Sequence, residues 1–97
     1  MTRSDILRQL ASQSATLKQR FGMRDLAVFG SVARDEALPG SDLDLLVSFD
    51  APASFDRFMG LKLYLEDALG MRVDLVTANA LRPEMRSQIE REAIHVA

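Results

Sequence analysis

The apolar residues of this chain follow two spacings, one typical of helices and the other of strands. In residues 4–21 and 55–69 they recur every three or four positions, or at multiples of that step, which predicts two amphipathic helices. We expect the first helix to be capped by Ser4 and ended by Gly22, and the second to be closed by Gly70 in the left-handed conformation. The apolar positions of the first helix are Ile6, Leu10, Leu17 and Phe21.

Three further segments have the composition of strands. Residues 26–29 form a short apolar run, and residues 42–49 and 71–77 alternate between apolar and polar side chains. Turns are predicted at Pro39-Gly40-Ser41 and Asn79-Ala80, a last helix from Pro83 to about Ala93, and a short terminal strand over 94–96. The element order predicts one α/β (α+β) domain over residues 1–97. Its small mixed sheet of three or four strands should carry helices packed on one face, and the first two strands should pair.

Two aspartates are separated by one residue at the start of the predicted strand 42–49. Side chains alternate between the two faces of a strand, so Asp42 and Asp44 should point the same way, with Cα atoms about 6.6 Å apart. Because like charges repel and acids are poor strand formers, we expect a cation between them. Asp74 has the corresponding place in the strand 71–77. Three converging carboxylates suit Mg²⁺, and two such ions about 4 Å apart would polarise both oxygens of an in-line phosphoryl displacement.

A Gly-Ser pair follows the predicted strand 26–29. Gly30 allows the backbone to approach a ligand closely, and Ser31 adds a hydroxyl donor. Residues 32–35 can open a short helix whose first amides would face a phosphate. Arg34 lies one turn further on, where it either reaches the β or γ phosphate or stays solvated. The pattern favours a turn that binds a triphosphate.

At these residues the sequence resembles a known family. Gly30-Ser31, ten intervening residues, Asp42-x-Asp44 and the later lone Asp74 are similar to the signature of the DNA polymerase β-like nucleotidyltransferase superfamily. The form present here resembles its minimal branch, the MNT domain, and the resemblance covers nearly the whole chain, including segments 81–83 and 89–94. It implies the polymerase β-like nucleotidyltransferase fold.

The resemblance also implies roles and a partner. We expect the first two acids to bind both metal ions, and the third to bind the catalytic ion and help activate the attacking hydroxyl. The expected nucleotide-binding residues are Gly30, Ser31, Arg34 and Ser41. MNT proteins are typically antitoxins paired with HEPN-domain toxins, which they silence by binding or by attaching AMP to a tyrosine. The resemblance therefore implies a Mg²⁺-dependent nucleotidyltransferase that takes ATP and transfers AMP to a tyrosine of a partner HEPN toxin.

Composition narrows the possible partners. With 12 Lys and Arg against 14 Asp and Glu, the net charge of -2 argues against direct nucleic-acid binding, and a triphosphate would need divalent cations. No apolar run approaches the roughly 20 residues that cross a bilayer. No cysteine is present, so we expect a cytoplasmic protein without membrane association. The 97 residues leave no room for an acceptor-binding domain beside the core elements, so we expect the acceptor to come from another molecule.

The residues leave two functions open. One is the enzyme; the other is a non-catalytic antitoxin that occludes its toxin and keeps the acidic site as a relic or a regulatory nucleotide pocket. Pro-Gly-Ser-Asp is also ordinary turn chemistry, so Asp42 and Asp44 could simply cap a strand. Three acids on one sheet face favour the enzyme, because a pure binder does not need them. The nucleotide, the acceptor residue and the stoichiometry stay open at this stage.

Overall fold

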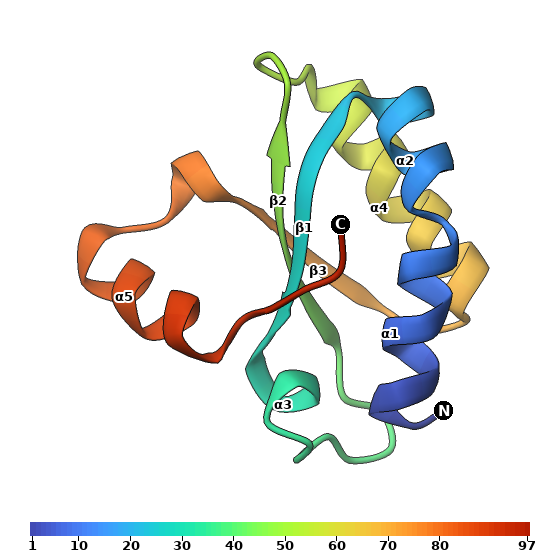
Figure 1. Cartoon of the computed structure of the whole chain (residues 1–97), viewed down its shortest axis with the longest axis vertical. Helices are drawn as coiled ribbons and strands as arrows, with labels where there is room; N and C mark the ends of the chain where they lie inside the picture. The colour runs from blue at the N-terminus through green and yellow to red at the C-terminus, as the bar shows by residue number, and fades with distance from the viewer.

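Four strands form one mixed sheet in the computed structural model, which describes all of residues 1–97 (Figure 1). Along the chain the elements are α1 (Arg3–Ser12), α2 (Ser14–Phe21), β1 (Met23–Phe29), α3 (Gly30–Ala33), β2 (Leu43–Phe49), α4 (Phe55–Leu69), β3 (Val73–Thr77), the 3₁₀ helix η1 (Ala78–Ala80), α5 (Pro83–Glu92) and β4 (Ile94–His95). The spatial order is β3-β2-β1-β4, with β1 antiparallel to both β2 and β4, and β2 parallel to β3. The predicted mixed α/β sheet and the pairing of the first two strands are confirmed.

The hydrophobic core lies between the sheet and three helices. In Figure 1, α1, α2 and α4 stand on one side of the strands, and all four apolar positions predicted for the first helix are buried. In β2 the buried residues Leu43, Leu45 and Val47 alternate with partly exposed ones. This alternation divides the sheet into a face that packs against these helices and an opposite face, here called the open face, which carries Asp44.

Helix α5 departs from the predicted packing on one face. It lies on the other side of the strands from α1, α2 and α4 and contacts α3 (Figure 1). Pro83 begins the helix as predicted, and Ile89 is its buried residue. The helix is otherwise strongly polar, so its sequence did not indicate which side of the sheet it would occupy. The expectation that helices pack on one face therefore holds for α1, α2 and α4 only.

The predicted helix over residues 4–21 is two helices. The break falls at Gln13, which ends α1 and precedes α2, between two serines with low helix propensity. The helix also begins earlier than predicted, because Thr2 and not Ser4 is the N-cap. The Thr2 hydroxyl accepts the Asp5 N–H (3.1 Å), and the Asp5 carboxylate accepts the Thr2 N–H (3.1 Å). This reciprocal pair is a capping box.

Replacing Thr2 with alanine should lower the free energy of unfolding by about 1 kcal/mol, because the first turn of α1 loses its side-chain cap. The control is Ser4→Ala, since Ser4 lies inside the helix with an exposed side chain, where alanine has the better propensity. Chemical denaturation of both variants measures the difference. Equal effects of the two substitutions would mean that the capping box does not stabilise the fold.

The strand boundaries also differ from those predicted. Strand β1 begins at Met23 rather than at residue 26, and the exposed pair Arg24 and Asp25 concealed it; the pairing with β2 is irregular at this point. Strands β2 and β3 begin at Leu43 and Val73, one and two residues later than expected. Helix α4 has the predicted bounds, and Gly70 closes it in the left-handed conformation, with φ 66°. None of the helices combines the length and the apolarity that a membrane span requires.

Candidate active site

Two of the three predicted acids are adjacent in the sheet. Asp44 of β2 and Asp74 of β3 are register partners in the parallel pair. In both strands the residues on either side of the aspartate are buried, so both carboxylates lie on the open face. Asp44 is half-buried, whereas Asp74 is exposed. The sheet thus brings together a pair of carboxylates at the amino-terminal ends of β2 and β3.

Asp42 stands apart from this pair. It precedes β2 and is not part of the strand, contrary to the prediction that the strand itself would align it with Asp44. Its carboxylate forms an ion pair with the Arg72 guanidinium (Nε–Oδ1 3.0 Å), and Arg72 also donates to the Gly40 carbonyl at 3.4 Å. Asp42 is nevertheless close enough to act electrostatically on Asp44. Sequence reasoning missed Arg72, which lies two residues before Asp74.

Gly30 lies directly against Asp44. Its φ of +73° is in the left-handed region, and a Cβ built on it would come within 2.1 Å of the Asp44 carboxylate oxygen Oδ2. The pairing of Phe29 with Asp44 across β1 and β2 brings the two residues together. This position does require close approach, but the group that approaches it is Asp44 and not a ligand, so the predicted contact with a triphosphate stays a prediction. Only glycine leaves Asp44 its present position.

The other predicted nucleotide-binding residues differ in their surroundings. Ser31 is half-buried in the single turn of α3, as the predicted short helix requires. Arg34 is not free: its guanidinium donates to Glu36 (3.2 Å) and to Glu92 (3.1 Å), and these bonds raise its pKa. Ser41 closes the preceding loop, where its hydroxyl accepts the Leu38 N–H at 2.9 Å. Ser41 thus has a local structural bond, and its contact with a nucleotide stays a prediction.

Glu92 is a site residue to which the sequence analysis gave no role. It is the last residue of α5, and its Oε1 accepts the Gly30 N–H at 3.0 Å while its Oε2 accepts from Arg34. A signal was present in the sequence, because a carboxylate in the last turn of a helix opposes the helix dipole and needs a compensating partner. The partner is the Gly-Ser turn, 62 residues earlier in the chain.

Crowding of negative charge governs the electrostatics of the acids. The pKa of Asp44 is raised, first by burial and then by the nearby carboxylates of Asp74 and Asp42; Arg34 opposes the shift. A raised pKa means that ionised Asp44 opposes folding: its contribution to stability is present below the ordinary pKa of aspartate and is lost as the pH rises through the folded-state value. A bound cation would remove this penalty.

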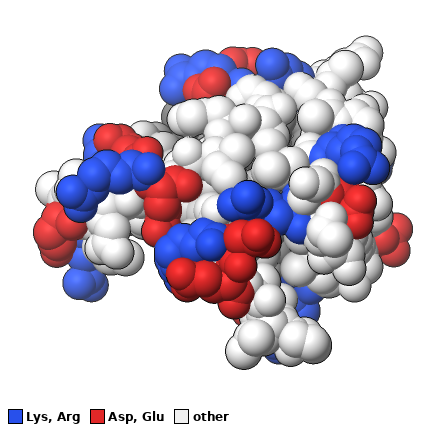
Figure 2. All heavy atoms as spheres, turned by 60° about the horizontal axis from the view of Figure 1, so that its bottom comes forward, with Lys and Arg blue, Asp and Glu red and all other residues white.

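The donor set fits a hard divalent cation, although the acids are not arranged around one. No group of three or more Asp, Glu, His or Cys side chains has the geometry to hold a metal ion. Asp44 and Asp74 supply carboxylate oxygens from adjacent strands, which is the ligand chemistry that Mg²⁺ prefers. Asp42 would join them only after releasing Arg72. On the surface around α3, acidic and basic side chains lie side by side, and neither charge forms a continuous patch (Figure 2).

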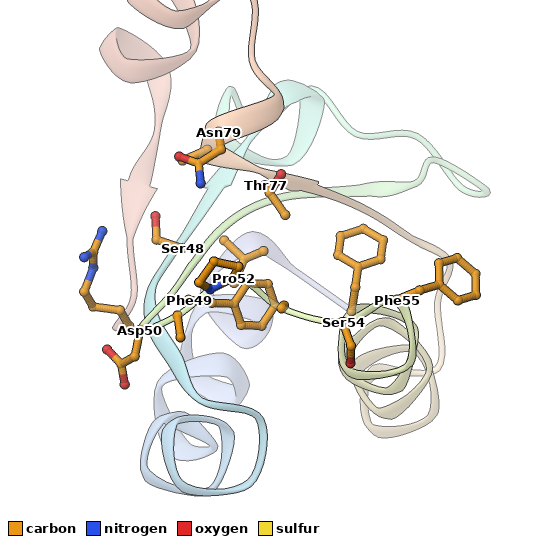
Figure 3. Close-up of a pocket in the computed structure, with 14 residues that line it drawn as sticks. Ser48, Phe49, Asp50, Pro52, Ser54, Phe55, Thr77 and Asn79 are labelled. Atoms are coloured by element: carbon orange, nitrogen blue, oxygen red, sulfur yellow. The ribbon is translucent and has the colours of Figure 1, made fainter.

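Two hollows lie outside this acidic pair. One, of about 710 Å³, is at the carboxyl-terminal ends of β2 and β3, where Phe49, Pro52, Phe55 and Thr77 line it (Figure 3). None of the seven predicted site residues lines this hollow. The other, of about 810 Å³, is lined by the loop over 37–41, by the start of α1 and by Arg72, and includes Ser41. The candidate chemistry therefore lies on the open face of the sheet and not in either hollow.

Comparisons with known proteins show which family the chain resembles. A family model described as "Nucleotidyltransferase domain" matches residues 10–96. A protein adenylyltransferase of Thermococcus cleftensis is 40% identical over 96 residues, which cover 99% of this chain and 97% of that protein. The solved structure of a candidate minimal nucleotidyltransferase is 45% identical and has a TM-score of 0.83, covering 97% of this chain and 95% of its own.

A more distant solved structure shares the fold alone. It holds a tri-AMPylated Shewanella oneidensis HEPN toxin in complex with an MNT antitoxin. Its matching chain has a TM-score of 0.68 at 17% identity, over 94% of this chain and 71% of its own.

Proposed function

The chain belongs to the nucleotidyltransferase domain family and is a nucleotidyltransferase, and we propose that it transfers AMP from ATP, with Mg²⁺, to a tyrosine hydroxyl of a partner HEPN toxin. The reaction class follows from the family. The nucleotide, the metal and the acceptor are the proposed part. In this reaction the hydroxyl oxygen attacks the α-phosphorus and gives up its proton to the solvent, the bond from that phosphorus to the bridging oxygen breaks, and pyrophosphate leaves with the bonding electron pair.

The observation that carries the proposal is the pairing of Asp44 and Asp74 on the open face, with Gly30 against Asp44. Two carboxylates placed side by side in a sheet repel each other and lower the stability of the apo fold. This cost is expected where the pair binds a cation or takes part in a reaction. Asp74, the more exposed of the two, lies where an incoming hydroxyl has access. Asp44 is closer to the Gly-Ser turn and hence to the phosphates.

Each residue then has a defined task. Asp44 and Asp74, joined by Asp42, would hold the Mg²⁺ ions, which when bound supply charge stabilisation at the transferred phosphoryl group. Ser31 donates its hydroxyl to a phosphate oxygen, and Arg34 offers its guanidinium to the β or γ phosphate. Ser41 keeps the loop before Asp42 closed through its bond to Leu38.

The relatives support the choice of AMP and of a protein acceptor. The similar protein of Thermococcus cleftensis carries the name protein adenylyltransferase, and it matches this chain over nearly the full length of both. The Shewanella oneidensis complex joins an AMPylated HEPN toxin to an MNT antitoxin. The name of the first supports a protein as the acceptor, and the second complex suggests that this protein is a toxin, with the present chain as the antitoxin that modifies it.

The second candidate function is an antitoxin that neutralises its toxin by occlusion. The observation in its favour is the ion pair between Asp42 and Arg72, which engages one predicted metal ligand. Occlusion needs no transfer, so it predicts protection of cells without any adduct on the toxin. Mass spectrometry of a co-expressed partner distinguishes the two functions, because one AMP adduct adds a fixed mass to a tyrosine-containing peptide.

The metal assignment is tested by replacing both Asp42 and Asp44 with asparagine. We expect Mg²⁺-dependent ATP affinity to fall at least about tenfold, because the cation loses two anionic ligands. The melting temperature should be equal or higher, because relief of the crowding of carboxylates around Asp44 outweighs the loss of the exposed ion pair between Asp42 and Arg72. Calorimetric titration with ATP and Mg²⁺ measures the affinity.

The matched control for this test is Asp67→Asn, which removes the charge of an exposed acid on α4, remote from the open face. Its ATP affinity should equal that of the unchanged protein. If the double variant binds ATP with Mg²⁺ as tightly as this control does, the assignment of the acids as metal ligands is wrong.

A further inference from the structure

We propose that Glu92 is a positioning residue for the reaction, which fixes the Gly-Ser turn and Arg34 in the orientation that receives the triphosphate. The inference rests on the proposed function of Gly30, Ser31 and Arg34. It goes further because it assigns a role to the end of α5, which lies far from the acids in sequence and supplies none of them. The carboxylate joins two groups of the turn at once, Gly30 N–H at 3.0 Å and Arg34 Nη1 at 3.1 Å.

The backbone around Glu92 is held on both sides. Before it, Ile89 is buried and its carbonyl accepts the Ala93 N–H at 2.9 Å. After it, Ile94 pairs with Val28 in the antiparallel ladder of β4 and β1. The backbone of Glu92 is thus fixed relative to the sheet, and its side chain holds the Gly-Ser turn in a fixed position relative to the same sheet.

The ladder itself explains why this residue meets the turn. Antiparallel pairing joins Ala27 to His95 and Val28 to Ile94, and the same register continued by two residues places Gly30 opposite Glu92. At that point the chain has turned out of the strand into α5, so no main-chain carbonyl continues the ladder. The side-chain oxygen of Glu92 accepts the Gly30 N–H instead. The turn therefore keeps an acceptor where the sheet ends.

Both oxygens of Glu92 are bonded, and its side chain is only 20% exposed. This arrangement is typical of a residue that orients other groups. Arg34 needs such orientation, because its side chain is 45% exposed and its other partner, Glu36, is itself 65% exposed. Glu92 holds the Arg34 guanidinium beside α3. Without Glu92, the only remaining partner of Arg34 is the exposed Glu36, which leaves the guanidinium free to change its orientation.

The test compares Glu92→Ala and Glu92→Gln with the matched control Glu90→Gln, which changes an exposed charge on the same helix. We expect Glu92→Ala to weaken ATP affinity in the presence of Mg²⁺ about tenfold, the size of one lost charged hydrogen bond. Glu92→Gln keeps an acceptor for Gly30 N–H and should recover part of that loss, while Glu90→Gln should bind as the unchanged protein does. KM for ATP should rise more than kcat falls.

A second measurement does not depend on nucleotide. Amide exchange by NMR should show the Gly30 N–H protected in the unchanged protein and in Glu92→Gln, and unprotected in Glu92→Ala. If the Gly30 amide stays protected in Glu92→Ala, or if Glu92→Ala binds ATP as tightly as or more tightly than the control, the positioning role is wrong. Loss of ATP binding in the unchanged protein and in Glu90→Gln alike would instead contradict the proposed function, and the amide measurement would still decide the role of Glu92 in the turn.

Discussion

Replacing Gly30 with valine is expected to lower nucleotide transfer more than a hundredfold and to reduce stability. The added side chain meets two obstacles. It must adopt φ +73°, which costs a residue with a Cβ roughly 1 to 2 kcal/mol. It also places a Cβ within 2.1 Å of Oδ2 and 3.1 Å of Cβ of Asp44, so that Asp44 must rotate away from its place beside Asp74. Transfer assays and thermal unfolding measure the two effects.

A matched control separates the two obstacles. Gly70 has nearly the same conformation, with φ +66°, and a Cβ added there meets nothing within 4 Å. Gly70→Val should therefore lose stability through backbone strain and keep ATP affinity. Ser31→Ala, which removes one hydrogen bond to a phosphate, should cost on the order of 1 to 3 kcal/mol in binding. If Gly70→Val and Gly30→Val reduce transfer equally, the contact between Gly30 and Asp44 is not what the reaction needs.

The parts of the fold that depend on local patterns could be predicted from sequence. Helix α4 has the predicted bounds because its apolar stripe is continuous and Gly70 ends it. The alternation in β2 likewise indicated that Asp44 would lie on the side opposite to Leu43 and Leu45. Asp74 followed from the same alternation in β3. These features depend on one segment at a time.

The parts that depend on pairing between segments could not be predicted in the same way. Nothing local shows that Asp44 and Asp74 are register partners, or that Arg72 holds Asp42. The acceptor that Glu92 supplies to Gly30 joins residues 62 positions apart through the β1 and β4 ladder. The place of Glu92 in the last turn of α5 indicated that its carboxylate needs a partner, but not which residue that partner is. From the sequence we therefore named candidate residues and expected their carboxylates to converge, whereas the pairings that hold them in place come from the topology of the sheet.

Replacing Asp74 with asparagine distinguishes a catalytic antitoxin from one that acts only by binding. Asp74→Asn should lower transfer about a hundredfold or more, because the metal ion that would activate the attacking hydroxyl loses one of its carboxylate ligands. Asp74 is a single exposed residue of β3, and the substitution replaces one carboxylate oxygen with an amide group. A complex with the partner toxin should therefore stay largely intact. Co-purification measures the complex, mass spectrometry the AMP adduct, and growth of the co-expressing cells the protection. We expect an intact complex, no adduct and returning toxicity, with Asp67→Asn as the control that keeps the adduct. If Asp74→Asn still protects cells, and the partner of the unchanged protein carries no adduct either, then the protein acts by occlusion and the transfer to a toxin is wrong.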